Sequence, residues 1–290
     1  MAEEKDIDPL SGVDTTGHEW DGIKELNNPM PRWWLWTFYG TVIWALIYTI
    51  AFPAWPMIGQ ATQGLLGYDS RREVAEDIAA AAAAKQLYRD QIGGMELAEI
   101  ATDPELLRFA QVSGAATFRT YCAQCHGAGA AGNPGFPNLL DDDWIWGGTP
   151  EAIHLTVTHG IRAPEDPDSR IGDMPAFGRD QLLDGEQMAA VTEYVLSLSG
   201  QDHDAALAET GATVFAENCV SCHGEDGTGL AELGGPDLTD AIWLYPDGRQ
   251  GILETLASGR RGMMPAWSER LSPEQIKEVA LYVHSLGGGE

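Results

Sequence analysis

Residues 120–139 read TYCAQCHGAGAAGNPGFPNL, and residues 217–238 read ENCVSCHGEDGTGLAELGGPDL. Each stretch places two cysteines three residues apart and a histidine directly behind the second cysteine. The chain has 4 cysteines, and all of them lie in these two motifs. No cysteine therefore remains for a disulfide or metal site elsewhere in the chain, and the two motifs must be explained together.

Three kinds of site use paired cysteines at this spacing. A zinc site would draw four ligands from the two pairs, but each pair here has its own histidine and its own sequence surroundings. A thioredoxin-like redox pair follows a β-strand, and neither motif is preceded by a β-rich pattern. The third possibility is covalent haem, in which two thioethers fix the vinyl groups and the adjacent histidine reaches the iron. The predicted attachment residues are Cys122, Cys125, Cys219 and Cys222, and the predicted proximal ligands are His126 and His223.

The two motifs lie at the same place in a longer repeat. GAATFRTYCAQCHG, from Gly114, aligns without a gap with GATVFAENCVSCHG, from Gly211. Downstream, each copy reaches a Met-Pro-Ala-aromatic sequence and then an amphipathic helical pattern. We therefore expect two tandem domains of one kind, over residues 103–200 and 208–290.

The secondary structure is expected to be mainly α-helical. Asp103 followed by Pro104 predicts an N-cap and the first turn of a helix that leads to the first motif. Ser272, with Pro273 and Gln275, predicts a second start through a capping box. Apolar residues three and four apart then predict core-facing stripes. These stripes are Ile276, Val279, Val283 and Leu286 in the second copy, and Met188, Val191, Val195 and Leu198 in the first.

A membrane anchor is expected near the N-terminus. Residues 33–55, WWLWTFYGTVIWALIYTIAFPAW, contain no charged side chain. A bilayer core of about 30 Å needs about 20 helical residues, and tryptophans at the two ends suit the membrane interfaces. A buried core helix would be shorter with a polar side, and a cleaved signal peptide would follow basic rather than acidic residues. We predict an N-terminal segment at 1–32, a transmembrane anchor at 33–55, and a helical, mostly exposed connector at 56–102.

The residues around each motif resemble class I c-type cytochromes, over about residues 104–200 and 208–287. In that family, the carbonyl of a proline after the motif holds the second ring nitrogen of the proximal histidine, which fixes the ring and raises its basicity. The matching residues are Pro137 and Pro236. The family also crosses its first and last helices at a glycine and an aromatic residue. The matches are Gly114 with Phe118, Gly211 with Phe215, and Tyr194 and Tyr282 from the last helices.

The second axial ligand of each iron should then be methionine, which gives a higher reduction potential than a second histidine. Met174 and Met264 open the repeated Met-Pro-Ala-aromatic sequence, and this repetition argues against simple core fillers. Met263 aligns with Asp173, so the repeat selects Met264. We assume that each methionine serves the iron of its own domain, although an exchange between domains remains open.

Two histidines are rival ligands for the first iron. His154 and His159 lie between the first motif and Met174, but neither has a counterpart in the second copy. By default they are surface or loop histidines.

With histidine and methionine on both irons, no coordination position remains for oxygen or substrate. The chain should therefore carry electrons rather than catalyse a reaction. Its net charge of -27 disfavours nucleic acid and favours a basic protein partner such as a donor cytochrome c.

The N-terminal sequence HEWDGIKELNNPMPRWWLWTFYG, residues 18–40, makes the resemblance narrower. With one span and two Cys-x-x-Cys-His domains, the whole chain resembles the dihaem subunit III of cbb-type haem-copper cytochrome c oxidases. The resemblance implies two covalently bound haem c groups and electron transfer towards a monohaem subunit and a catalytic subunit that reduces oxygen and pumps protons. It also implies that residues 27–34 dock against the complex. The alternatives are a tethered dihaem cytochrome that serves a dehydrogenase or another respiratory complex, and a dihaem peroxidase.

The resemblance also implies a location. Haem attachment in bacteria takes place outside the cytoplasmic membrane, so the haem domains should be periplasmic and the N-terminus cytoplasmic. The basic residues near the span favour the opposite orientation, since Arg32 precedes it and Arg71, Arg72, Lys85 and Arg89 follow it. We give the haem domains priority over this weaker signal.

Overall fold

The computed structural model describes residues 6–289, and this part of the chain divides after Ala83 into two compact units. The first unit contains a β-hairpin that the sequence analysis did not predict. Strands β1 (Thr15–Trp20) and β2 (Ile23–Leu26) pair antiparallel, and Trp20 lies opposite Ile23. The two residues between them, Asp21 and Gly22, both have positive φ, as a tight hairpin turn requires.

Helix α1 (Arg32–Ala51) is long and apolar enough to cross a membrane, and none of its apolar window is buried. It ends before the predicted limit at residue 55. Pro53 explains the difference, because the residue before a proline is disfavoured in helical conformation. Phe52 accordingly is extended, with φ -114° and ψ 162°. The structure therefore contains a candidate membrane-spanning helix that is shorter than the predicted segment.

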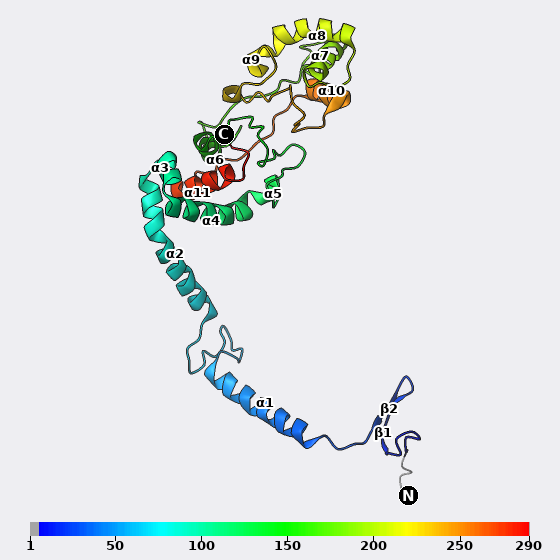
Figure 1. Ribbon diagram of the computed structural model, residues 1–290. Helices are drawn as coiled ribbons and strands as arrows, with labels where there is room; N and C mark the ends of the chain where they lie inside the picture. The colour runs from blue at the N-terminus through cyan, green and yellow to red at the C-terminus, as the bar shows by residue number, and fades with distance from the viewer. Residues whose placement is uncertain (1–5, 290) are drawn as a thin grey trace. The chain divides into compact units, whose positions relative to one another are not determined.

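The second unit is built from helices (Figure 1). They are α2 (Ser70–Gly94, which begins in the first unit), α3 (Leu97–Thr102), α4 (Pro104–Tyr121), α5 (Ala123–His126), α6 (Pro150–His159), α7 (Gly185–Leu198), α8 (Ala205–Asn218), α9 (Val220–His223), the 3-10 helix η1 (Ala231–Leu233), α10 (Gly248–Ser258) and α11 (Pro273–His284). The predicted caps are confirmed. The Asp103 carboxylate accepts hydrogen bonds from the first turn of α4, and Ser272 and Gln275 form the capping box of α11.

The helices pack in an order that differs from two contiguous domains. Helix α4, from the first repeat, packs against α11, the last helix of the second repeat, and α6 also packs on α11. Helix α7, from the first repeat, packs against α8 and α10 of the second. In Figure 1, α11 accordingly lies beside α4 and α6, whereas α7, α8 and α10 form the other group. Each packed half therefore combines segments of both repeats.

Two glycines show why the exchange is possible. A Cβ at Gly114 would overlap the backbone of Glu278 and lie 2.8 Å from the Cβ of Tyr282. A Cβ at Gly211 would overlap the backbone at Ala190 in the same way. Both repeats thus contain the same close helix crossing, and the last helix of either repeat can supply its partner. The expected glycine crossings are confirmed, but the tyrosine partners come from the other repeat.

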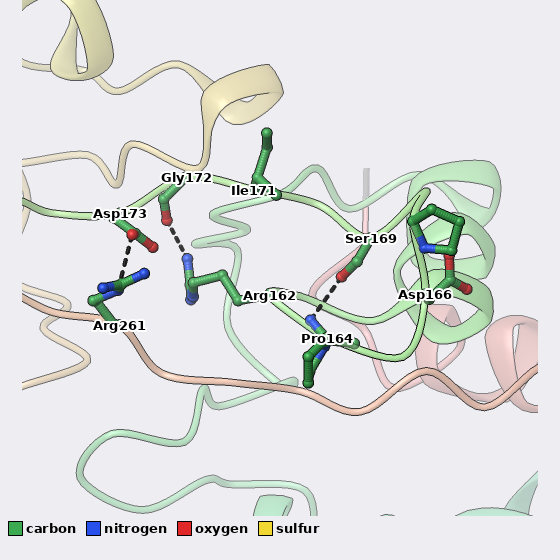
Figure 2. Close-up of a pocket in the computed structure, with 10 residues that line it drawn as sticks. Arg162, Pro164, Asp166, Ser169, Ile171, Gly172, Asp173 and Arg261 are labelled. Carbon is green, nitrogen blue, oxygen red and sulfur yellow. Dashed lines mark hydrogen bonds and ion pairs between the residues drawn. The ribbon is translucent and has the colours of Figure 1, made fainter.

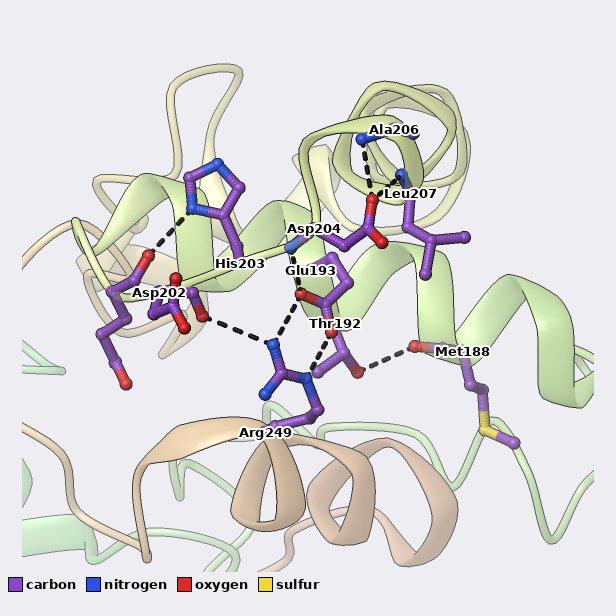
Figure 3. Close-up of polar contacts among 10 residues, drawn as sticks. Met188, Thr192, Glu193, Asp202, His203, Asp204, Ala206, Leu207 and Arg249 are labelled. Carbon is purple, nitrogen blue, oxygen red and sulfur yellow. Dashed lines mark hydrogen bonds and ion pairs between the residues drawn. The ribbon is translucent and has the colours of Figure 1, made fainter.

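An ion pair between a buried carboxylate and a half-exposed arginine stabilises the half that contains α7, α8 and α10 (Figure 3). Glu193 on α7 is 5% exposed, and its carboxylate accepts hydrogen bonds from the Arg249 guanidinium at 2.5 and 2.9 Å and from the Asp204 backbone N–H at 2.8 Å. Arg249 lies on α10, and Asp204 is the N-cap of α8. One carboxylate therefore joins three elements of this half.

Candidate functional site

Each Cys-x-x-Cys-His motif forms a single helical turn directly after a long helix. Helix α4 ends at Tyr121, the Cys122 carbonyl accepts hydrogen bonds from the N–H groups of Cys125 and His126, and α5 ends at His126. Gly127 then reverses the chain with φ 80°. The second motif repeats this geometry after α8. Both cysteines and the histidine of a motif are therefore carried by one turn, as covalent attachment of a haem requires.

The thiols are not arranged for redox chemistry of their own. All four cysteines are free, and burial raises the pKa of Cys122 and of Cys219 to about 11. A reactive or disulfide-exchanging cysteine needs a lowered pKa. Each motif also follows an α-helix rather than a β-strand, and this placement argues against the thioredoxin-like alternative.

The two motif histidines are oriented by backbone carbonyls. The Nδ1 atom of His126 lies 3.2 Å from the carbonyl oxygen of Pro137, and the Nδ1 atom of His223 lies 3.1 Å from that of Pro236. Both contacts occur as the resemblance implied. Burial lowers the pKa of each histidine, which favours the neutral ring. When Nδ1–H donates to the carbonyl, Nε2 keeps its lone pair for a metal.

The two candidate methionines lie in different halves of the second unit. Met264 packs against the core cluster that contains Phe118 and Trp267, and Cys122 packs against the same cluster. Met174 packs against the cluster that includes the buried Cys219. Each methionine therefore shares a core with the motif of the other repeat. This differs from our assumption that each methionine serves its own repeat, and it agrees with the alternative of an exchange.

Short backbone bridges hold both methionine segments. Met264 and Ile161 exchange N–H···O=C hydrogen bonds of 3.0 and 2.9 Å, and Met174 and Arg260 exchange a matching pair of 3.1 and 3.0 Å. Gly160, directly before Ile161, has φ 70°, and a Cβ there would overlap the backbone of the Met264 segment.

The matching glycine in the second repeat is Gly259, with φ 71°, against the Met174 segment. We did not predict these glycines as site residues. Gly160 and Gly259 do follow Pro137 and Pro236 by the same number of residues in the two repeats, which is a usable signal.

The rival histidines have other surroundings. Nδ1 of His159 lies 3.0 Å from an Asp166 carboxylate oxygen, so this ring is engaged in a polar pair. His154 lies on α6 and is half-buried, and burial lowers its pKa. Neither residue belongs to the core cluster that receives Met264.

The side chains around the motifs fit a haem. The indole Nε1 of Trp243 is buried and has no hydrogen-bond partner among the described residues, so it can donate to a group held in this half. Trp144 occupies the matching place in the first repeat, where its Nε1 donates to the Gly288 carbonyl. Free thiols on one turn, a histidine whose pKa burial lowers, and a methionine packed on the same core would supply the donors of a histidine–methionine haem c in each half.

Two protein-family models match this chain. The model of the N-terminal domain of cytochrome oxidase-cbb3, FixP, matches residues 12–59, and the model of cytochrome c oxidase, cbb3-type, subunit III, matches residues 110–195 and 206–283. These matches cover the N-terminal segment with α1 and both Cys-x-x-Cys-His repeats.

Relatives of similar length agree with the family models. The Cbb3-type cytochrome c oxidase subunit CcoP of Cereibacter sphaeroides is 59% identical over 276 residues, 95% of this chain and 95% of that protein. The subunit FixP of Sinorhizobium medicae is 51% identical over 286 residues, 99% of this chain and 98% of that protein. The CcoP of Rhodobacter capsulatus is 53% identical over 287 residues, 96% and 97% of the two chains. The chain belongs to the family of cbb3-type cytochrome c oxidase subunit III, the cytochrome c subunit that transfers electrons within this terminal oxidase.

Proposed function

We propose that the chain holds two haem c groups and relays single electrons through them towards the oxygen-reducing part of the oxidase. Cys122 and Cys125 would attach one haem, and Cys219 and Cys222 the other. One-electron exchange is the chemistry that haem c supplies when it is bound. The observation that carries the proposal is the equivalence of the two motif turns, each with two free thiols and a histidine on one turn and a proline carbonyl on the histidine ring.

The axial pairing that the packing favours is exchanged between the repeats. His126 and Met264 would ligate the iron of the half built on α4 and α11, and His223 and Met174 that of the other half. Core packing supports this pairing, because each methionine lies in the cluster of the motif that it would serve. Pro137 and Pro236 would orient the proximal histidines.

With both axial positions filled by side chains of this chain, no position is left for oxygen. The role of this subunit would then be non-catalytic. Oxygen reduction and proton pumping would belong to a separate catalytic subunit, with a monohaem subunit between the two. A dihaem peroxidase would instead need one iron that opens, so a slow or absent reaction of the holoprotein with peroxide would support the electron-transfer role.

The location and the donor follow from the same proposal. We place the N-terminus in the bacterial cytoplasm, α1 in the inner membrane and the haem-bearing unit in the periplasm. The net charge of -27 favours a basic cytochrome c as the donor.

Intact-mass measurement of the purified protein tests the haem count. Two haem additions with no free thiol are expected, because the 4 cysteines supply two thioethers to each haem. A Cys219→Ala, Cys222→Ala double variant is the matched control and should retain one haem. A single addition in the unmodified protein, or thiols that still react with an alkylating reagent, would contradict the proposal.

A further inference from the structure

Arg162 connects the two segments that precede the candidate methionines. Its Nε donates to the Gly262 carbonyl at 2.5 Å. Its Nη1 donates to the Gly172 carbonyl, and Figure 2 shows this second bond. Gly172 lies two residues before Met174, and Gly262 lies two residues before Met264. One guanidinium therefore bridges the same backbone position of both methionine segments.

The backbone of Arg162 is held in an unusual conformation. Its φ is 52°, in the left-handed region that residues with a Cβ rarely adopt. The Arg162 N–H donates to the Arg170 carbonyl at 2.7 Å, and the preceding residue, Ile161, exchanges two hydrogen bonds with Met264. Such conformations persist where the surroundings determine them, and they are concentrated at functional positions. Hydrogen bonds therefore fix the backbone that carries the Arg162 side chain, and the pair at Ile161 joins this backbone to Met264.

The repeat supplies a residue for comparison. Arg261 follows Gly259 by two residues, as Arg162 follows Gly160. Its Nε forms an ion pair of 2.8 Å with the Asp173 carboxylate, and 72% of its side chain is exposed (Figure 2). Arg261 thus contacts a side chain next to one methionine, whereas Arg162 contacts backbone of both segments. Exposed pairs of this kind contribute little to stability.

The chemistry of arginine suits a bridging role. Hydrogen bonds from a charged donor are stronger than those between neutral groups. The planar guanidinium presents its donors in a fixed fork, so two carbonyls bound to it are held at a fixed separation. A lysine could not reproduce this, because its donors share one nitrogen on a flexible stem.

We propose that Arg162 is a positioning residue shared by the two haem centres, which holds Met174 and Met264 in place together. This inference rests on the axial ligation under the proposed function. Its consequence is a coupling between the centres: loss of one side chain that is not itself a ligand should weaken both methionine–iron bonds. If the two haem centres were independent, loss of Arg162 would change at most one of them.

The test uses the full-length, haem-loaded protein and its Arg162→Gln, Arg162→Lys and Arg261→Gln variants. Imidazole is titrated into the oxidised protein, where it must displace methionine to bind the iron. The charge-transfer band of methionine-ligated ferric haem is recorded at each step. Haem content by mass and helical content by circular dichroism are measured in parallel.

In Arg162→Gln, both haems should bind imidazole about tenfold more tightly, as expected for the loss of one charge-assisted hydrogen bond at each site. Arg162→Lys should show a smaller change at both haems, and this milder variant covers the case in which Arg162→Gln loses the fold. Arg261→Gln should match the unmodified protein. Unchanged affinities in both Arg162 variants, or a change confined to one haem, would overturn the inference.

Failure of the proposed function would look different. If the unmodified oxidised protein lacked the methionine charge-transfer band, the axial ligation itself would be refuted. If the band is present and responds to Met174→Leu and Met264→Leu but not to the Arg162 variants, only the positioning role is refuted.

Discussion

The Glu193–Arg249 pair allows a quantitative prediction about the half that contains α7, α8 and α10. Hydrogen bonds from Arg249, with a further one from the Asp204 N–H, lower the pKa of the Glu193 carboxyl from its ordinary value of 4.5 to about 2. At 1.36 kcal/mol per pKa unit, this lowering corresponds to about 3 kcal/mol of stability. The Arg249 side chain is 52% exposed, and solvent screening reduces the expected value to about 2 kcal/mol.

The sign of the pH dependence follows from the lowered pKa. Glu193 is ionised in the folded state at pH values where the unfolded chain already binds a proton. Its contribution is therefore complete above about pH 4.5 and is lost as the pH falls towards about 2. Glu193→Gln should lower the free energy of unfolding by about 2 kcal/mol at pH 7, and the difference from the unmodified protein should shrink at pH 3.5.

Urea unfolding of the detergent-solubilised holoprotein, followed by circular dichroism at pH 7 and pH 3.5, measures this difference. Asp180→Asn is the matched control, because Asp180 pairs with Arg179 on the surface, with both side chains about half exposed. That variant should leave the stability close to that of the unmodified protein at either pH. A Glu193→Gln effect of equal size at both pH values, or no larger than that of the control, would refute the reasoning.

Three further outcomes are expected. Electron transfer from a basic cytochrome c should slow as salt rises, because the charge of -27 steers the encounter and is screened over about 8 Å at physiological ionic strength; a salt-independent rate would contradict this. Met264→Leu should lower the reduction potential of one haem, whereas Met263→Leu, at a position 59% exposed, should not; a larger loss with Met263→Leu would place the ligand one residue earlier. Gly114→Ala should lower the free energy of unfolding by about 2 kcal/mol because of overpacking, whereas Gly94→Ala, where the Cβ meets no neighbour, should not. Equal melting temperatures for the two variants would argue against the close crossing.

Local signals were sufficient for the capped helices and for the two motif turns, but the hairpin of β1 and β2 was not predicted. Asp103 and Ser272 cap the predicted helices because their side chains accept hydrogen bonds from the first turn, an interaction determined by neighbouring residues. The proline carbonyl on each motif histidine was expected from the resemblance to class I c-type cytochromes, and the structure shows both contacts. The caps depend on a few adjacent residues, so they could be predicted from the sequence alone.

The exchange of the last helices could not be predicted in this way. Tyr194 and Tyr282 occupy the same position in two similar helices, and either one fits the glycine crossing of either repeat. The choice depends on how the chain connects the halves, which is not a local property. The contacts of Arg162 were not predicted, because they also depend on the tertiary fold. Its two carbonyl partners, Gly172 and Gly262, lie 10 and 100 residues further along the chain.

The exchanged axial ligation is tested most directly by a density map of the haem-loaded protein at a resolution that shows the sulfur bound to each iron. We expect the Met264 Sδ opposite His126 and the Met174 Sδ opposite His223. A map with the Met174 Sδ opposite His126 would contradict the pairing, and a map with no sulfur at either iron would contradict histidine–methionine ligation altogether.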